Sequence, residues 1–139
     1  TSNESFLGSY VWEYNYDNYS KIHLAFLKGR AAIINKDQVV LKEQANFIRS
    51  QFEVAIANAA LGYLGKWRTG TSDAARAHAI GEGAGFIYSL RFCKLNGANI
   101  NFSDGILKEL LVSPNGFWDI TNEKVLSAEN KIKAQFKIN

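Results

Sequence analysis

Apolar residues recur at helical spacing along this chain, and this periodicity constrains its fold more than any other feature. Between residues 39 and 64 the apolar stripe consists of Leu41, Ala45, Ile48, Phe52, Ala55 and Ala59, at alternating spacings of four and three. Such a stripe lies along one face of an α-helix, whereas a half-buried strand alternates with a period of two. We therefore expect a long core helix here and an all-α fold around it.

Similar stripes elsewhere, with end signals between them, predict an antiparallel helical bundle. Asp17 or Asn18 is suited to cap a first helix, Thr71 or Ser72 a third, and Thr121 the last. The expected helices cover residues 18–34, 39–64, 73–93, 103–112 and 122–136. We expect three long helices, a short one and a closing C-terminal helix, joined by short loops that favour antiparallel neighbours.

The domain organisation is expected to be simple. Residues 1–17 are rich in Tyr and Trp without a clear period, and we expect an irregular aromatic arm packed on the bundle. Residues 18–139 are expected to form one helical-bundle domain, because a chain of 139 residues suits a single compact core. The chain begins with Thr1 and contains no Met, so we expect it to be part of a longer polypeptide.

Composition excludes several classes of function. The net charge of +3 comes from scattered Lys and Arg, so no clustered basic stripe predicts a nucleic-acid interface. Cys93 is the single cysteine, which excludes an intrachain disulfide and a multi-cysteine metal site. No apolar run approaches the roughly 20 residues of a membrane span, so no transmembrane segment is expected.

The first candidate site is the pair His78 and Glu82 in the third expected helix. Residues four apart share a helix face, and this pair lies in a run of Gly and Ala that should bring another helix or a ligand close to Gly81 and Gly85. One interpretation is a metal-ligand or acid–base pair in the bundle. The other is a hydrogen-bonded pair that locks the helix in place, because a buried carboxylate needs a partner.

The first expected helix could supply the rest of this site. His23 and Arg30 flank its apolar stripe, and we expect one of them to face Glu82. His78, Glu82 and His23 would form a set suited to iron or another divalent metal, with Arg30 in a supporting ion pair. The alternative for Arg30 is a side chain that extends to solvent over the core.

Ser89 and the absence of known catalytic patterns indicate whether this site should be catalytic. Ser89 lies seven residues past Glu82 and could extend the same polar face; the alternative is that its hydroxyl bonds its own helix backbone. The HExxH order of zinc peptidases is absent, and no nucleophile with a base and an orienting group is apparent. We therefore expect binding rather than catalysis.

Three phrases also carry a family resemblance. Residues 25–33 read AFLKGRAAI, residues 78–91 read HAIGEGAGFIYSLR, and residues 115–119 read NGFWD. In this order they resemble the imelysin-like family of uncharacterised envelope lipoproteins of Gram-negative bacteria, over most of the chain from Tyr19 to Phe136. The resemblance implies a helical bundle, a place in the cell envelope, and a missing N-terminal half of the same protein.

The resemblance also implies a link to iron or haem uptake through a G-x-H-x-x-E metal motif. Here Arg76 stands where the motif has Gly, and Glu82 follows His78 by four positions rather than three. Our main expectation is a non-catalytic envelope binding protein for a metal, haem or another small ligand. The alternative is a structural or protein-interaction helical module with a buried His, Glu and Arg lock.

Overall fold

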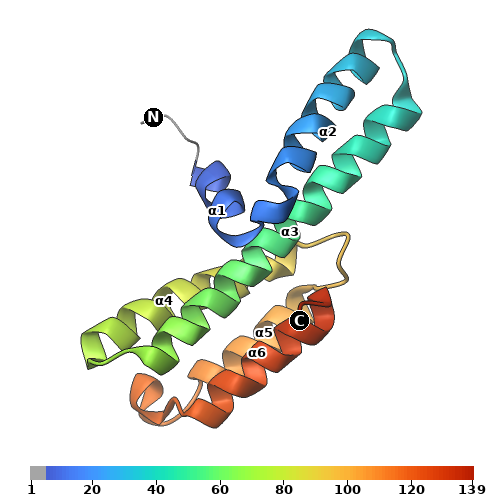
Figure 1. Ribbon diagram of the computed structural model, residues 1–139. Helices are drawn as coiled ribbons and strands as arrows, with labels where there is room; N and C mark the ends of the chain where they lie inside the picture. Colours follow the sequence, from blue (N-terminus) through green and yellow to red (C-terminus); the bar gives the residue numbers. More distant parts are fainter. Residues whose placement is uncertain (1–5) are drawn as a thin grey trace. The chain divides into compact units, whose positions relative to one another are not determined.

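The computed structural model describes residues 6–139, with side chains from Gly8 onward, and this range contains helices and no strand. The α-helices are α1 (Phe6–Tyr14), α2 (Tyr16–Ile34), α3 (Gln38–Thr69), α4 (Asp73–Ser89), α5 (Ile100–Leu111) and α6 (Asn122–Phe136). Two 3-10 turns, η1 (Leu90–Phe92) and η2 (Gly116–Asp119), follow α4 and precede α6. The predicted all-α class is confirmed (Figure 1).

Contacts divide the chain into two units, Thr1–Ala55 and Ile56–Asn139, and the boundary falls inside α3. In the first unit, α2 packs against the first part of α3 as a helical hairpin closed by residues 35–37. The buried residues of α2 are Ile22, Ala25, Gly29 and Ala32, at spacings of three, four and three. An added Cβ at Gly29 would lie 3.8 Å from the Cβ of Gln44, so the two helices approach closely there.

The expected irregular arm is wrong over residues 6–14, which form α1. Val11 from this helix is buried in a cluster with Ile22 and Ala55, and this packing stabilises a helix that is too short to be stable alone. Asn15 separates α1 from α2, and its Nδ2 donates a hydrogen bond to the backbone oxygen of Gln51, 3.0 Å away. Residues 1–5 of the predicted arm lie outside the described residues.

Helix α3 is longer than predicted. The expected helix ended at residue 64, beside Gly62 and Gly65, but α3 continues through both glycines to Thr69. A helical glycine is less favourable than alanine by only about 1 kcal/mol. Leu64 and Trp67 are both buried in this last part of the helix, and their burial outweighs that penalty.

The second unit joins the last part of α3 to α4, α5 and α6. Its fully buried large side chains are Leu64, Ile87, Leu90, Leu110, Val125 and Ile132. The predicted caps Ser72 and Thr121 are confirmed, since their hydroxyls accept hydrogen bonds from the backbone N–H groups of Ala75 and Lys124.

Helix α5 begins earlier than predicted. The expected helix began at Ser103, but α5 begins at Ile100, and the Asn99 side chain caps it by accepting from the N–H of Phe102, 3.1 Å away. Ser103 is instead fully buried, and its hydroxyl donates to the backbone oxygen of Ile87 at 2.8 Å, which ties α5 to α4. Within residues 6–139, no helix combines the length and apolarity needed to cross a bilayer.

Candidate functional site

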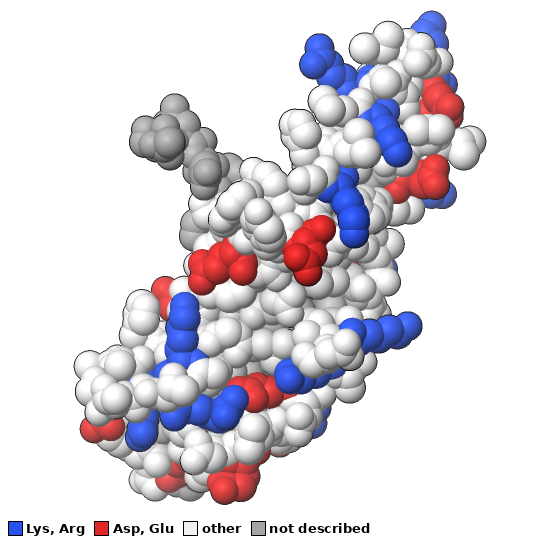
Figure 2. All heavy atoms as spheres, viewed as in Figure 1, with Lys and Arg blue, Asp and Glu red and all other residues white. Residues whose placement is uncertain are grey.

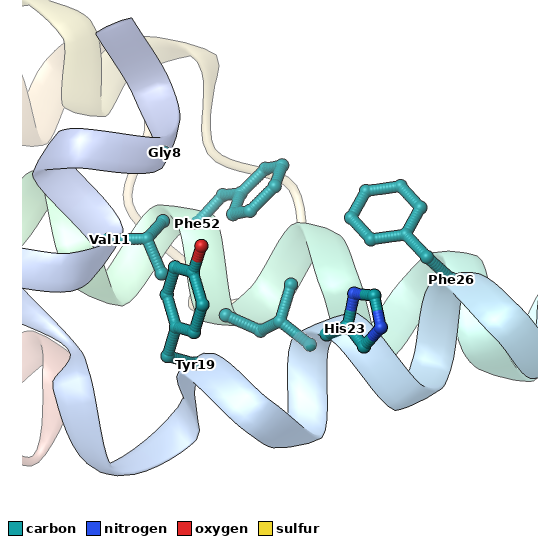
Figure 3. Close-up of a pocket in the computed structure, with 7 residues that line it drawn as sticks. Gly8, Val11, Tyr19, His23, Phe26 and Phe52 are labelled. Carbon is teal, nitrogen blue, oxygen red and sulfur yellow. The ribbon is translucent and has the colours of Figure 1, made fainter. Parts of the chain in front are cut away.

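A pocket in the first unit is the best candidate site. It has a volume of about 350 Å³, within the range of about 300–1,000 Å³ that is usual for ligand sites. Its lining residues are Gly8, Val11, Tyr19, Ile22, His23, Phe26 and Phe52 (Figure 3). These residues come from α1, α2 and the first part of α3, so three helices build the pocket.

The spacing of residues on α2 creates most of this pocket. Tyr19, His23 and Phe26 follow one another at spacings of four and three, so they lie along one side of the helix, beside its buried face. Phe52 reaches the pocket from α3, and its ring centroid lies 6.4 Å from that of Phe26. This geometry is that of an aromatic pair in favourable contact.

The lining of the pocket is mainly apolar, with two groups that can form hydrogen bonds. Three aromatic rings and two aliphatic side chains provide apolar contacts, while the Tyr19 hydroxyl and the His23 imidazole can form hydrogen bonds. The described lining residues include no carboxylate, cysteine or serine that could act as a nucleophile or as the partner of a base. The arrangement can hold an apolar or aromatic group and orient it through one or two hydrogen bonds.

The structure places the predicted site residues on exposed helix faces. His78 and Glu82 lie one turn apart on α4, and both are exposed. The positions that follow them, Ala79 and Gly83, are the buried ones, because one residue corresponds to a turn of about 100° around the helix. The exposure of Glu82 means that it does not need the partner that burial would require.

His23 and Arg30 lie on α2 and are exposed as well. The predicted lock needs buried His, Glu and Arg side chains, whereas His23, Arg30, His78 and Glu82 are each exposed. The structure does not support the lock, which stays a prediction. In the described part of the chain, no three side chains of His, Cys, Asp or Glu are grouped so that they could hold a metal ion. Iron binding by His78, Glu82 and His23 stays a prediction.

A partly buried ion pair joins α3 to α6 in the second unit. The Nε of Arg68 on α3 donates to the Oε1 of Glu129 on α6 at 3.0 Å, and the Glu129 side chain is 10% exposed. Its sequence signal is that Glu129 follows Val125 by four and precedes Ile132 by three positions. A carboxylate among the apolar residues of an amphipathic helix indicates a buried, partnered group.

In α4, the glycine at the close helix contact and the hydrogen bond of Ser89 both differ from the main expectation. An added Cβ at Gly83 would lie 3.4 Å from the Cβ of Tyr63 on α3, whereas one at Gly81 or Gly85 would have nothing within 4 Å. Gly83 is therefore the position of close helix packing. The Ser89 hydroxyl donates to the backbone oxygen of Gly85 at 2.9 Å, which confirms the alternative interpretation of that residue.

Charged side chains of both signs occur on the surface of the protein. On the face drawn in Figure 2, basic and acidic side chains are interspersed over the surface. Among the charged residues of α2, Arg30 lies one turn beyond Phe26 and is exposed. The described residues offer it no ion pair.

Comparison with known proteins yields one match. A family model described as a domain of unknown function (DUF4856) matches residues 1–139. No curated protein and no solved structure matches the chain. The prediction of an uncharacterised family is confirmed, and the imelysin-like resemblance stays a prediction.

Proposed function

We propose, from the premise that this chain belongs to the DUF4856 family, whose function is unknown, that it is a non-catalytic docking module. The docking surface is the α2–α3 hairpin, which would bind an apolar surface of another protein. The observation that carries this proposal is the exposure of large apolar side chains along α2, where Phe26 is 53%, Ile33 61% and Ile34 72% exposed.

Helix α2 has more apolar surface than one neighbouring helix can cover. Beside its buried face runs an aromatic stripe, which consists of Tyr19, His23, Phe26, Arg30 and Ile33. On the side of α2 that faces away from its buried residues runs an aliphatic stripe, which consists of Leu24, Leu27, Ala31 and Ile34. An amphipathic helix with one neighbour needs a single apolar stripe, so the pattern of α2 favours additional partners.

The distribution of exposure supports a docking surface over a normal solvent face. Single exposed apolar residues are common, but contiguous ones mark interaction sites. Full burial of a large apolar side chain contributes about 1.5–3 kcal/mol, so covering the exposed half of Phe26 or Ile33 contributes roughly 1 kcal/mol each. A partner that covers several such side chains gains considerable affinity. The pocket at Phe26 and Phe52 would receive the largest side chain of the partner.

The test uses a designed peptide as a defined partner. A labelled, neutral helical peptide with Leu at the positions of a seven-residue repeat is titrated with the whole chain, and binding is followed by fluorescence anisotropy. We expect the double variant Phe26→Ser, Ile33→Ser to bind at least about ten-fold more weakly, because two apolar contacts are lost.

The matched control is the double variant Asp17→Ser, Arg49→Ser. Both residues are exposed, neither belongs to a stripe, and their charges cancel. We expect its affinity to stay within about two-fold of the original, with circular dichroism showing that every variant keeps its helix content. A peptide that does not bind, or that loses equal affinity in both variants, would contradict the proposal.

A second candidate is binding of haem or iron at His23, the use that the imelysin-like resemblance implies in a bacterial envelope. It is supported by the position of His23 in a pocket with three aromatic rings, since an imidazole is a common axial ligand of haem iron. Titration with haemin should then change its Soret absorbance, and His23→Ala should abolish the change. His78→Ala, at the one other histidine of the chain, is the control that should preserve it.

A further inference from the structure

We infer that the partner docked on the aromatic stripe is an amphipathic helix that carries carboxylates facing Arg30. This inference rests on the proposed docking function and names the chemistry of its partner. Three features of α2 support it. The stripe forms a straight row, Arg30 has no ion pair among the described residues, and the stripe contains no carboxylate that a second copy could offer.

The stripe is a straight row along α2, and a row of this kind has the shape that a partner helix can pack against side by side. Its five residues, Tyr19 to Ile33, follow one another at spacings of four, three, four and three. This is the seam spacing of helices that pack side by side. The ring of Tyr19 already contacts that of Trp12 in α1, with centroids 5.0 Å apart. The part of the stripe left for a partner runs from His23 to Ile33, which at about 1.5 Å per residue is roughly 15 Å, or about three turns of a partner helix.

Arg30 determines the charge of that partner. It lies between Phe26 and Ile33 in the stripe, so a helix that covers these two residues also covers part of Arg30. The described residues supply no carboxylate to its guanidinium. Covering a charged group without a partner is unfavourable, and a guanidinium is suited to a bidentate pair with a carboxylate.

A second copy of α2 would not provide this carboxylate. In an antiparallel pairing centred on Phe26, Arg30 would lie opposite His23 of the copy. In a parallel pairing it would lie opposite another Arg30, and like charges disfavour that contact. The stripe itself contains no Asp or Glu, so the partner should have a different sequence.

Three peptides with the same Leu seam test this inference on the whole chain. They carry Gln, Glu or Lys at the positions that flank the seam, and their affinities are measured in ~0.05 M and ~0.5 M salt. In low salt we expect the Glu peptide to bind about five-fold more tightly than the Lys peptide, and high salt to reduce this difference. Arg30→Glu should reverse the order of the two.

The control is Lys28→Glu, which changes the charge of the same helix equally but lies outside the aromatic stripe. It should leave the Glu peptide preferred. Equal affinity for all three peptides would overturn the inference and leave the docking function standing, whereas binding of none would overturn both.

Two further outcomes would also overturn the inference. Reversal by Lys28→Glu but not by Arg30→Glu would place the acidic partner on the other side of α2. Sedimentation that shows a dimer, abolished by Phe26→Ser, would mean that a second copy occupies the stripe.

Discussion

Glu129 is a residue at which a single polar substitution should lower stability. Glu129→Gln removes the charge that Arg68 binds at 3.0 Å, in a side chain that is only 10% exposed. Breaking a buried pair typically costs about 3–5 kcal/mol; because Arg68 is 38% exposed, we expect a smaller loss here, about 1–2 kcal/mol in the free energy of unfolding. Urea denaturation of both proteins measures the difference.

Glu109→Gln is the matched control for Glu129→Gln, because it removes the same charge from an exposed ion pair. Glu109 pairs with Lys131, and both side chains are more than a third exposed, so solvent screening should keep its loss below about 1 kcal/mol. Hydrogen bonds from Lys131 and Ser127 hold the pKa of Glu109 below its ordinary value of 4.5. Its contribution is therefore present above that value and lost as the pH falls through the lowered pKa. Equal losses in the two variants at neutral pH would contradict this ranking.

At the scale of the element, the glycines of α4 should respond in opposite ways. Gly81→Ala places its Cβ in open space, so it should raise the free energy of unfolding by about 0.5–1 kcal/mol through helix propensity. Gly83→Leu introduces a large side chain where a Cβ alone would lie 3.4 Å from Tyr63, and we expect a loss of about 1–3 kcal/mol. Thermal unfolding followed by circular dichroism checks both. A loss for Gly81→Ala would mean that a neighbour contacts that position.

At the scale of the whole molecule, the two units should differ in local stability. The large side chains that are fully buried belong to the second unit, whereas α2 buries Ile22 and the small residues Ala25, Gly29 and Ala32. Hydrogen exchange of the full chain should therefore show amides of α2 exchanging about ten-fold faster, or more, than the central amides of α5 and α6. Equal protection in all these helices would show that the chain opens as one cooperative unit.

Helices and helix caps that depend on residues close together in the sequence were predicted well. The spacing of Leu41, Ala45 and Ile48 predicted a helix, and the caps Ser72 and Thr121 bond N–H groups three residues away. Such interactions form within one turn, so their residues need no information about the rest of the fold. The last residues of α3, by contrast, depend on the burial of Trp67. That burial cannot be predicted from local sequence.

For the candidate site, too, local sequence predicted some features, and contacts between distant segments decided the others. The sequence alone determined that the chain is helical, that His23 lies beside an apolar face, and that His78 and Glu82 share a side of one helix. Only the tertiary structure decided that this pair is exposed and that Phe52 meets Phe26 at the pocket. It also decided that a partly buried ion pair joins Arg68 to Glu129, 61 positions later. Periodicity specifies which residues share a face, but burial depends on which faces meet, and those contacts arise between segments distant in the chain.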